Sequence, residues 1–191
     1  VRTLYSTGKL AQVINEMKHY QLDILGVSEM LWTDSGKIES DGMTIYYSGG
    51  TKHEKGVGII LTKEMAKSVI AWEPASERII MVRIETRYTK VTLIQVYAPT
   101  NAAEDQEKDE FYELLQDILD ATPEHDMKII MGDFNAQVGR DNTGWEETLG
   151  KEAIGVRNEN GERLLSYCSS NKLRIGDSVP SQKKTFTWGH R

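Results

Sequence analysis

The sequence predicts an α/β (α+β) protein in which two packed β-sheets are flanked by helices. Three observations support this fold class. Strand patterns rich in Val, Ile and Thr follow one another between residues 57 and 97, with gaps short enough for hairpins. Amphipathic helix patterns lie on either side of that stretch. Strands and helices do not alternate regularly, as they would in a doubly wound parallel sheet. The 191 residues are enough for one domain with a real core.

The chain begins with the pattern of a helix followed by a strand. Residues 6–8, Ser-Thr-Gly, can cap a helix. The apolar residues that follow recur at i, i+3, i+4 and i+7 and form one helical face: Leu10, Val13, Ile14 and Met17. Residues 22–28 form the pattern of a short buried strand. Residues 32–56 are rich in turn-forming residues, so only one brief strand, around residues 45–47, is expected there.

Four strands are expected in the middle of the chain, at residues 57–62, 69–73, 78–85 and 90–97. The last two are separated by four residues, a gap that suits a hairpin loop. The fourth strand ends before Pro99, because proline cannot donate to the hydrogen-bond ladder of a sheet. On the third strand one face carries a charged residue beside three apolar ones: Arg78, Ile80, Val82 and Ile84.

The last third of the chain returns to helices. Residues 103–121 form a long amphipathic helix whose predicted buried stripe is Phe111, Leu114, Leu115, Ile118 and Leu119. A strand at 127–131 and a Gly- and Asn-rich loop at 139–159 follow it. A helix at 160–171 is expected to turn three residues inward, Leu164, Leu165 and Cys168. Short strands are expected at residues 173–175 and 185–188.

Composition excludes some classes of protein and favours others. The apolar runs are too short to span a bilayer, so no membrane association is expected. A single cysteine, Cys168, cannot form an internal disulfide, and this favours a reducing, intracellular compartment. The net charge is −6 and the pI about 5.3. That balance counts against large, non-specific affinity for DNA but not against a metal-dependent enzyme that needs local carboxylates.

Polar residues follow several of the predicted strands, which is how a scaffold displays a site. Glu29 follows the first strand and Tyr97 ends the strand at 90–97. Asp133 and Asn135 follow the strand at 127–131, and on an extended chain they share one side. Hard cations such as Mg²⁺ take carboxylate and water oxygens together with substrate phosphate. Glu29 and Asp133 are therefore candidate metal or water ligands, and Tyr97 and Asn135 candidate phosphate contacts.

Each of these residues also has an ordinary structural interpretation. A lone glutamate after a strand is usually a turn residue, and Asp-Phe-Asn alone usually forms an Asx-type turn. Tyr97 alone is usually a half-buried aromatic whose hydroxyl is satisfied. Cys168 on an inner helix face is usually core. The four histidines show no zinc-ligand spacing, and no strand-to-helix phosphate loop is present.

The order of four motifs is more specific than any one of them. GVSEM, QVYAPT, MGDFNAQVG and TFTW occur in that order, each at a predicted strand end. Together they resemble the endonuclease/exonuclease/phosphatase superfamily, over essentially the whole chain. The resemblance is greatest to the endonuclease domain of RTE-type non-LTR retrotransposons and to proteins like craniofacial development protein 2. It implies a four-layer α/β sandwich with two mixed sheets and helices outside.

The resemblance implies roles for particular residues. Glu29 matches the family's metal-binding glutamate, and Asp133 the aspartate that orients or deprotonates the attacking water. Asn135 matches the asparagine that positions water and phosphate, and Tyr97 the tyrosine near the scissile phosphate. Substrate contacts are expected at Thr187, Thr100 and Asn101. The implied cofactor is Mg²⁺, with Mn²⁺ as an alternative. The implied partners are DNA and a fused reverse transcriptase, in the nucleus.

The chain departs from the family pattern in places. It has Ser28-Glu29-Met30 where Gln-Glu-Thr is frequent, and Thr100 where asparagine is frequent. The resemblance also implies that the family's first strand and its last strands, with an Asp and a His, lie beyond both ends of this chain. A single domain over 1–191, truncated at both ends and weakly active or inactive by itself, is therefore expected.

Three functions remain open on the sequence. The first is a Mg²⁺-dependent endonuclease that nicks DNA and leaves a 3′-hydroxyl. The second is a phosphomonoesterase of the same fold, for which basic residues near the site would be expected. The third is a non-catalytic remnant that serves as an interaction module, which the acidic charge favours.

Overall fold

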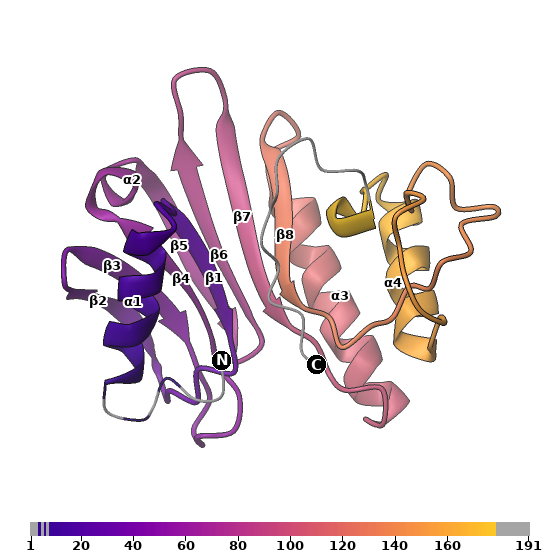
Figure 1. The fold of residues 1–191 in the computed structure, drawn as a ribbon, viewed down its shortest axis with the longest axis horizontal. Helices are drawn as coiled ribbons and strands as arrows, with labels where there is room; N and C mark the ends of the chain where they lie inside the picture. Colours follow the sequence, from indigo (N-terminus) through magenta and orange to yellow (C-terminus); the bar gives the residue numbers. More distant parts are fainter. Residues whose placement is uncertain (1–3, 5, 7, 179–191) are drawn as a thin grey trace. The chain divides into compact units, whose positions relative to one another are not determined.

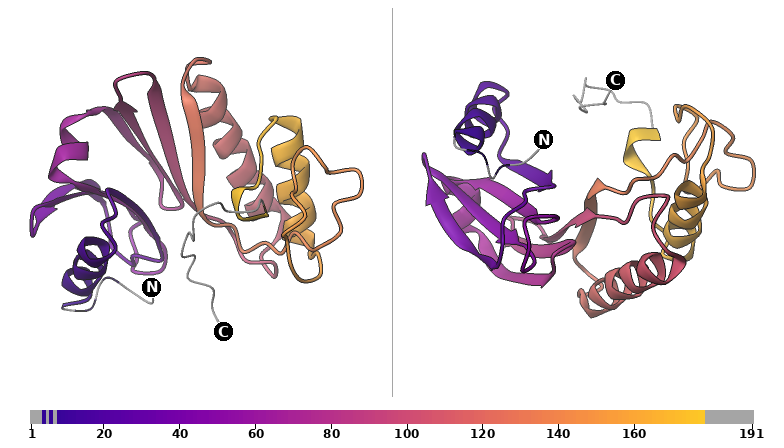
Figure 2. Two further views of the ribbon diagram at one scale, coloured as in Figure 1. Left: turned by 45° about the horizontal axis from the view of Figure 1, so that its top comes forward. Right: turned by 90° about the horizontal axis from the view of Figure 1, so that it is seen from below.

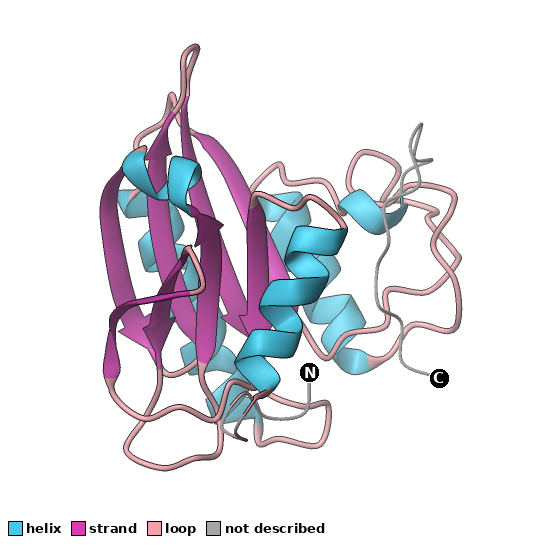
Figure 3. Cartoon of the chain, turned by 60° about the vertical axis from the view of Figure 1, so that its left-hand side comes forward, coloured by secondary structure: helices cyan, strands magenta, loops and turns pink. Residues whose placement is uncertain are grey.

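The computed structural model describes residues 4, 6 and 8–178 (Figure 1). Within it the chain forms two compact units. The first unit comprises Val1–Pro99 and Glu104–Asp133, and the second comprises Thr100–Ala103 and Phe134–Arg191. Both β-sheets belong to the first unit, whereas the described part of the second unit consists mainly of loops and helix; Figure 3 shows helices, strands and loops in different colours.

The first sheet has the strand order β1-β4-β3-β2. Its strands are β1 (Ile24–Ser28), β2 (Ser35–Ser40), β3 (Met43–Ser48) and β4 (Val57–Thr62). The resemblance implied that both sheets are mixed. In this sheet, however, all of the described strand pairs are antiparallel. The strand predicted at 57–62 is confirmed to the residue. Its apolar side chains are fully buried: Val57, Ile59, Ile60 and Leu61.

The second sheet has the order β5-β6-β7-β8 and is mixed, as expected. Its strands are β5 (Val69–Ser76), β6 (Ile79–Glu85), β7 (Lys90–Tyr97) and β8 (Met127–Asp133). The pairs β5–β6 and β6–β7 are antiparallel. The pair β7–β8 is parallel, with Tyr97 opposite Asp133 at its end. Parallel neighbours bring their carboxyl ends to one edge of the sheet, and this pairing decides where the polar strand ends lie.

The core between the two sheets follows from alternation along the strands. Side chains of β4 meet those of β6 and β7 in one apolar cluster that contains Ile59, Leu61, Ile80, Val82 and Leu93, each at most 2% exposed. Successive residues of a strand point to opposite faces. The apolar residues that alternate with the cluster residues along these strands therefore lie on the outer faces of the sheets, where helices must cover them. The two sheets therefore form the inner layers of a four-layer arrangement.

Two helices cover the outer faces. Helix α1 (Lys9–His19) packs Ile14 and Met17 against the β1–β4 sheet, beside which it lies in both views of Figure 2. Helix α3 (Asp105–Ala121) buries Phe111, Leu115, Ile118 and Leu119, whereas Leu114 is half-buried. The ammonium group of Lys128 in β8 donates to the carbonyl of Leu119, which joins α3 to the outer face of the second sheet.

Three local expectations need correction. Helix α1 has no side-chain cap: Gly8 is its N-cap, with φ +84°, a conformation that glycine adopts without a steric penalty. The stretch 32–56 contains the hairpin β2–β3 instead of one brief strand. Its turn is Asp41-Gly42, both with positive φ, the pair that two-residue hairpin loops prefer. A short helix, α2 (Lys63–Lys67), was not expected; the Thr62 hydroxyl caps it by accepting from the Met65 N–H.

The second unit is built around helix α4 (Glu159–Ser170). Leu164, Leu165 and Cys168 are buried on one side of it, as predicted. The loop before α4 folds back so that Leu149 and Ala153 pack with Leu165. Residues 173–175 are not a strand, because they form only an isolated bridge between Leu149 and Ile175 before a 3₁₀ turn, η1 (Gly176–Ser178). The strand predicted at 185–188 lies outside the described residues.

Candidate active site

Glu29 is held just beyond the end of β1. Its φ is +57°, which turns the chain out of the strand. The next two N–H groups, of Met30 and Leu31, then donate to the carbonyls of Gly56 and Lys55 at 3.0 and 2.8 Å. The Met30 side chain is fully buried and anchors this turn. Glu29 is therefore fixed by its neighbours on both sides and is not a residue of a loose turn.

Glu29 is brought to β7 by polar contacts between the two sheets. The Ser28 hydroxyl donates to the carbonyl of Val96 at 2.9 Å and accepts from the amide of Gln95 at the same distance. The sheets approach so closely here that a Cβ on Gly26 would lie 1.9 Å from the Gln95 side chain. Any larger residue at position 26 would require the Gln95 side chain, which holds Ser28, to move.

Tyr97 ends β7 and reaches Glu29. Its hydroxyl donates to Glu29 Oε1 at 2.7 Å. Burial raises the pKa of Tyr97 to about 12, and the hydrogen bond and the negative charge of Glu29 add to the rise. The phenol is therefore protonated at neutral pH and acts as a donor.

Asp133 ends β8, directly opposite Tyr97 in the parallel pair. Its backbone is tied to β7, because the Ala98 N–H donates to the Asp133 carbonyl at 2.8 Å. Its negative charge also contributes to the raised pKa of Tyr97, so the two carboxylates of Glu29 and Asp133 act on the same phenol. The structure thus brings together Glu29, Tyr97 and Asp133 from three strands of both sheets.

The glycine of the GDFN motif has a structural reason. Gly132 has φ +137°, and a Cβ there would lie 2.0 Å from the Val96 carbonyl oxygen. No other residue fits without moving β7 or β8. β8 stops one residue later, and Asn135 has φ +48°. The extended alternation expected to put Asp133 and Asn135 on one side therefore does not continue past Asp133.

The remaining predicted site residues lie in the second unit or outside the described chain. Within the second unit the Asn135 carbonyl accepts from the side-chain amide of Asn160 at 3.0 Å. The Asn101 side-chain oxygen accepts from the Asn160 N–H at 3.1 Å, near the start of α4. Thr100 is exposed. Thr187 lies outside the described residues.

A sequence profile of the endonuclease/exonuclease/phosphatase family matches residues 3–190. The chain belongs to this family. Craniofacial development protein 2 of Bos taurus is 39% identical over 184 residues, which cover 95% of this chain and 31% of that protein. Exodeoxyribonuclease III of Haemophilus influenzae is 32% identical over 136 residues, covering 62% of this chain and 49% of that protein. The chain spans about a third of the length of the craniofacial relative.

Solved structures of endonucleases share the fold of this family member. The endonuclease domain of TRAS1, a telomere-specific non-LTR retrotransposon, matches with a TM-score of 0.59 and 16% identity over 92% of this chain and 72% of that one. The AP endonuclease LMAP from Leishmania major matches with a TM-score of 0.56 and 9% identity, over 86% and 61%. At these identities the likeness concerns the fold alone.

The carboxylates of this family member fit a hard divalent cation. Mg²⁺ in proteins is usually held by one or two carboxylates, and waters and substrate phosphates complete its shell. Glu29 and Asp133 offer such a pair, and the Tyr97 hydroxyl fixes one oxygen of Glu29. Within residues 4, 6 and 8–178 no group of three or more His, Cys, Asp and Glu side chains has metal-binding geometry.

Arg78 is a neighbour of the site that sequence reasoning did not select. Its guanidinium donates to the Tyr97 carbonyl at 2.9 Å and to Glu107 at 2.6 Å. The signal was present, since Arg78 is a charge on an otherwise apolar strand face. Its partner on α3 was not visible, because Glu107 is 29 residues away in the chain.

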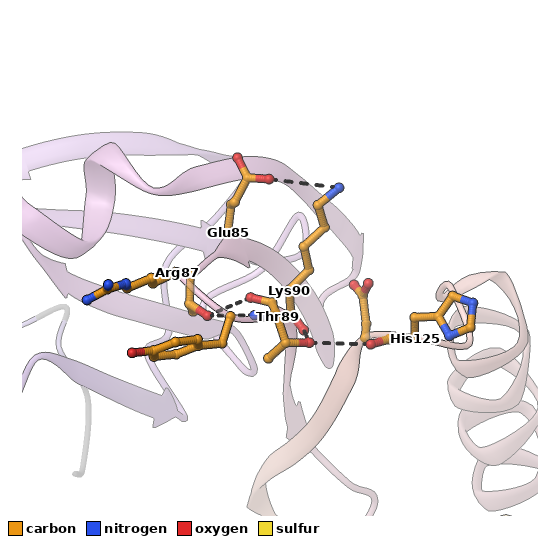
Figure 4. A pocket seen from close by; sticks show the side chains of 8 residues that line it. Glu85, Arg87, Thr89, Lys90 and His125 are labelled. Atoms are coloured by element: carbon orange, nitrogen blue, oxygen red, sulfur yellow. Dashed lines mark hydrogen bonds and ion pairs between the residues drawn. The ribbon is translucent and has the colours of Figure 1, made fainter.

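A surface hollow lies at the other end of β7 and is not part of this site (Figure 4). The β6–β7 hairpin and the turn before β8 line it. Glu85 and Lys90 form an ion pair of 3.9 Å, and the Thr89 hydroxyl faces the His125 carbonyl at 3.4 Å.

No described helix is long and apolar enough to cross a membrane.

Proposed function

We propose that this family member is a Mg²⁺-dependent DNA endonuclease domain that hydrolyses one phosphodiester and leaves a 3′-hydroxyl. One observation carries the proposal: the hydrogen bond between Tyr97 and Glu29, with Asp133 paired opposite Tyr97. These contacts gather a protonated donor and two carboxylates at one edge of the packed sheets. A solvated turn would not require three strand ends to meet in this way.

The proposed reaction is hydrolysis by direct attack of water on phosphorus. Asp133 accepts a hydrogen bond from the water and aligns it or takes its proton. A new P–O bond forms to the water oxygen, the bond from phosphorus to the 3′ oxygen breaks, and that oxygen takes up a proton. Bound Mg²⁺, or Mn²⁺, would supply positive charge that stabilises the phosphate oxygens. Glu29 would help to hold the ion, with its orientation fixed by Tyr97.

Four further residues enter the proposal because the family resemblance implies roles for them. Asn135, two residues along the chain from Asp133, is proposed to position water and phosphate. Thr100, Asn101 and Thr187 are proposed to contact the substrate. DNA as substrate, a nuclear location and a fused reverse transcriptase are further parts of this proposal. The TRAS1 structure, whose fold the chain shares, is the endonuclease domain of a telomere-specific non-LTR retrotransposon.

The proposal is tested by nicking of supercoiled plasmid in Mg²⁺ with protein in excess, so that even slow turnover is detected. Wild type is compared with Asp133→Asn, Glu29→Gln and an EDTA control. The matched control is Glu85→Gln, an exposed carboxylate at the far end of β6. We expect nicking by wild type and Glu85→Gln, and a loss of at least about 100-fold in the other two, since each removes a group with a proposed catalytic or metal-binding role.

Three results would contradict the endonuclease proposal. Equal nicking by wild type and Asp133→Asn would show a contaminating nuclease. Absence of nicking by folded wild type, with phosphate released from a monoester, would favour the phosphomonoesterase. Absence of both activities would favour the interaction module.

A further inference from the structure

Arg78 is joined to Tyr97 by three contacts within the first unit. The Tyr97 N–H donates to the Arg78 carbonyl at 2.9 Å, which is a ladder bond just before β6 begins. The guanidinium returns a bond to the Tyr97 carbonyl, also at 2.9 Å. The guanidinium carbon lies 5.4 Å from the centre of the Tyr97 ring, within the range of a cation–π contact. Arg78 therefore touches both the main chain and the ring of the tyrosine.

Acidic and basic neighbours hold the other side of the guanidinium. Its second nitrogen lies 2.6 Å from Glu107 in the first turn of α3. The same Glu107 oxygen lies 3.6 Å from the ammonium group of Lys55, which forms a 2.6 Å pair with Glu77. The Arg78 side chain is only 15% exposed. Arg78, Glu107, Lys55 and Glu77 thus form a row of four charges of alternating sign, and this row holds the guanidinium in place.

This arrangement determines where the Tyr97 hydroxyl points. Ladder bonds fix the Cα of Tyr97 but leave the ring its two side-chain torsions. Contact with the ring face restricts them, and the hydroxyl then meets Glu29 Oε1 at 2.7 Å. A planar group with donors in several directions is needed for this, and lysine does not provide one.

We propose that Arg78, held by Glu107, is a positioning residue that orients Tyr97 and, through the Tyr97 hydroxyl, the Glu29 carboxylate. Its effect on cation binding and hydrolysis rests on the proposed function, whereas its effect on the tyrosine ring does not. Helix α3 is then part of the apparatus that holds the site, although none of its residues touches Glu29 in the described contacts.

A double-mutant cycle on Mn²⁺ affinity tests the route through Tyr97. We expect Arg78→Met and Tyr97→Phe each to weaken Mn²⁺ binding about 10-fold, as loss of a partner behind a metal ligand does. In the Tyr97→Phe background Arg78→Met should have no further effect. Arg83→Met is the matched control, because Arg83 lies in β6, the strand that Arg78 precedes, and pairs with Asp126 instead. An equal loss in both backgrounds would refute the route through Tyr97.

The environment of the Tyr97 ring is followed without metal by ¹⁹F NMR of protein labelled with 3-fluorotyrosine. The signal of Tyr97 is identified as the one that disappears in Tyr97→Phe. Glu107→Gln keeps Arg78 in the chain but loosens it, so we expect it and Arg78→Met to broaden or split that signal. Arg78→Lys should restore it only in part, and Arg83→Met should leave it unchanged. A single unaltered signal in Arg78→Met and Glu107→Gln overturns the proposal.

Both measurements separate this proposal from the endonuclease proposal. If wild type binds no Mn²⁺ and nicks no DNA but the fluorine signal responds as expected, the proposed function fails and the positioning role stands. If nicking occurs, the rate at saturating DNA should fall in Arg78→Met with little change in KM, because alignment and not substrate binding is lost.

Discussion

Replacement of Gly132 should have the most direct effect on the stability of the fold. An alanine there would combine an unfavourable φ of +137° with a collision against Val96. We expect Gly132→Ala to lower the free energy of unfolding by more than about 3 kcal/mol, since backbone strain alone costs about 1–3 kcal/mol. Urea denaturation followed by tryptophan fluorescence measures this.

The matched control for Gly132 is Gly42, in the β2–β3 turn of the same unit. It too has a positive φ, +79°, but a Cβ there meets no atom within 4 Å. Gly42→Ala should therefore cost only about 1 kcal/mol. Equal losses in the two variants would show that φ alone matters and that the close approach to Val96 does not.

At the residue scale, sequence reasoning selected Glu29, Tyr97 and Asp133, the three residues on which the proposed site rests. It found them because each ends a run of alternating or apolar residues. It did not find Arg78, whose partner lies on a helix distant in sequence. It also placed Asn135 on a continued strand, because a positive φ at a non-glycine residue leaves no pattern in the sequence.

Three strands of the second sheet are joined by one acidic residue at the start of β8. Asp126 accepts two bonds from Arg83 of β6, at 2.6 and 2.9 Å, and one from Thr92 of β7 at 2.7 Å. The hydrogen bond from Arg83 is the main reason that the pKa of Asp126 falls to about 2. Because the folded pKa lies below the unfolded one, this carboxylate stabilises the fold above about pH 4, and that contribution is lost toward pH 2.

The variant Asp126→Asn isolates this contribution. We expect it to be less stable than wild type at pH 7, with the difference shrinking as the pH falls from 4 to 2. Urea midpoints measured at several pH values for both proteins give the comparison. A difference that stays constant down to pH 2 would show that the ion pair is not its source.

The start of helix α4 depends on the side chain of Asn158. Its oxygen accepts from the Gly161 N–H at 2.8 Å and from the Gln137 N–H at 3.0 Å. We expect Asn158→Ala to cost about 1 kcal/mol, as loss of an N-cap does. Asn158→Asp keeps the acceptor and should cost much less. Amide hydrogen exchange in the first turn of α4 is the measurement, and equal exchange in both variants would contradict the capping role.

At the element scale, the elements with strong periodicity were predictable. Helices α3 and α4 were found because their apolar residues recur with the helical period, and strands β4 and β7 because they are short runs rich in Val, Ile and Thr. The β2–β3 hairpin was missed, although Asp41-Gly42 is a strong hairpin signal, because β2 is an exposed polar strand. Helix α2 was missed because five residues are too few to show a period.

For the whole molecule, cation binding and folding should be linked. A ligand that binds only the folded state at about 100 times its Kd adds about 2.7 kcal/mol to stability. We expect Mn²⁺ to raise the Tm of wild type and of Glu85→Gln by several degrees, and EDTA to reverse it. Glu29→Gln should show little rise. An equal rise in Glu29→Gln, measured by calorimetry, would mean that the cation binds elsewhere.

The sequence predicted the two-sheet architecture well and the second unit less well. Hairpins and buried strands have recognisable patterns in short stretches of sequence, so both sheets could be inferred from those patterns. The loop between residues 139 and 159 has no period, and its packing of Leu149 and Ala153 on α4 depends on contacts that no local pattern encodes. Net charge argued against large, non-specific affinity for DNA but could not locate any site.

Cys168 has a practical consequence for labelling. It is the sole thiol of the chain, and burial raises its pKa to about 11, so maleimides should react with it slowly. Tyr88, by contrast, is 87% exposed at the tip of the β6–β7 hairpin, far along β7 from Tyr97. A Tyr88→Cys variant would then accept one fluorophore at a known place, without prior removal of the native cysteine.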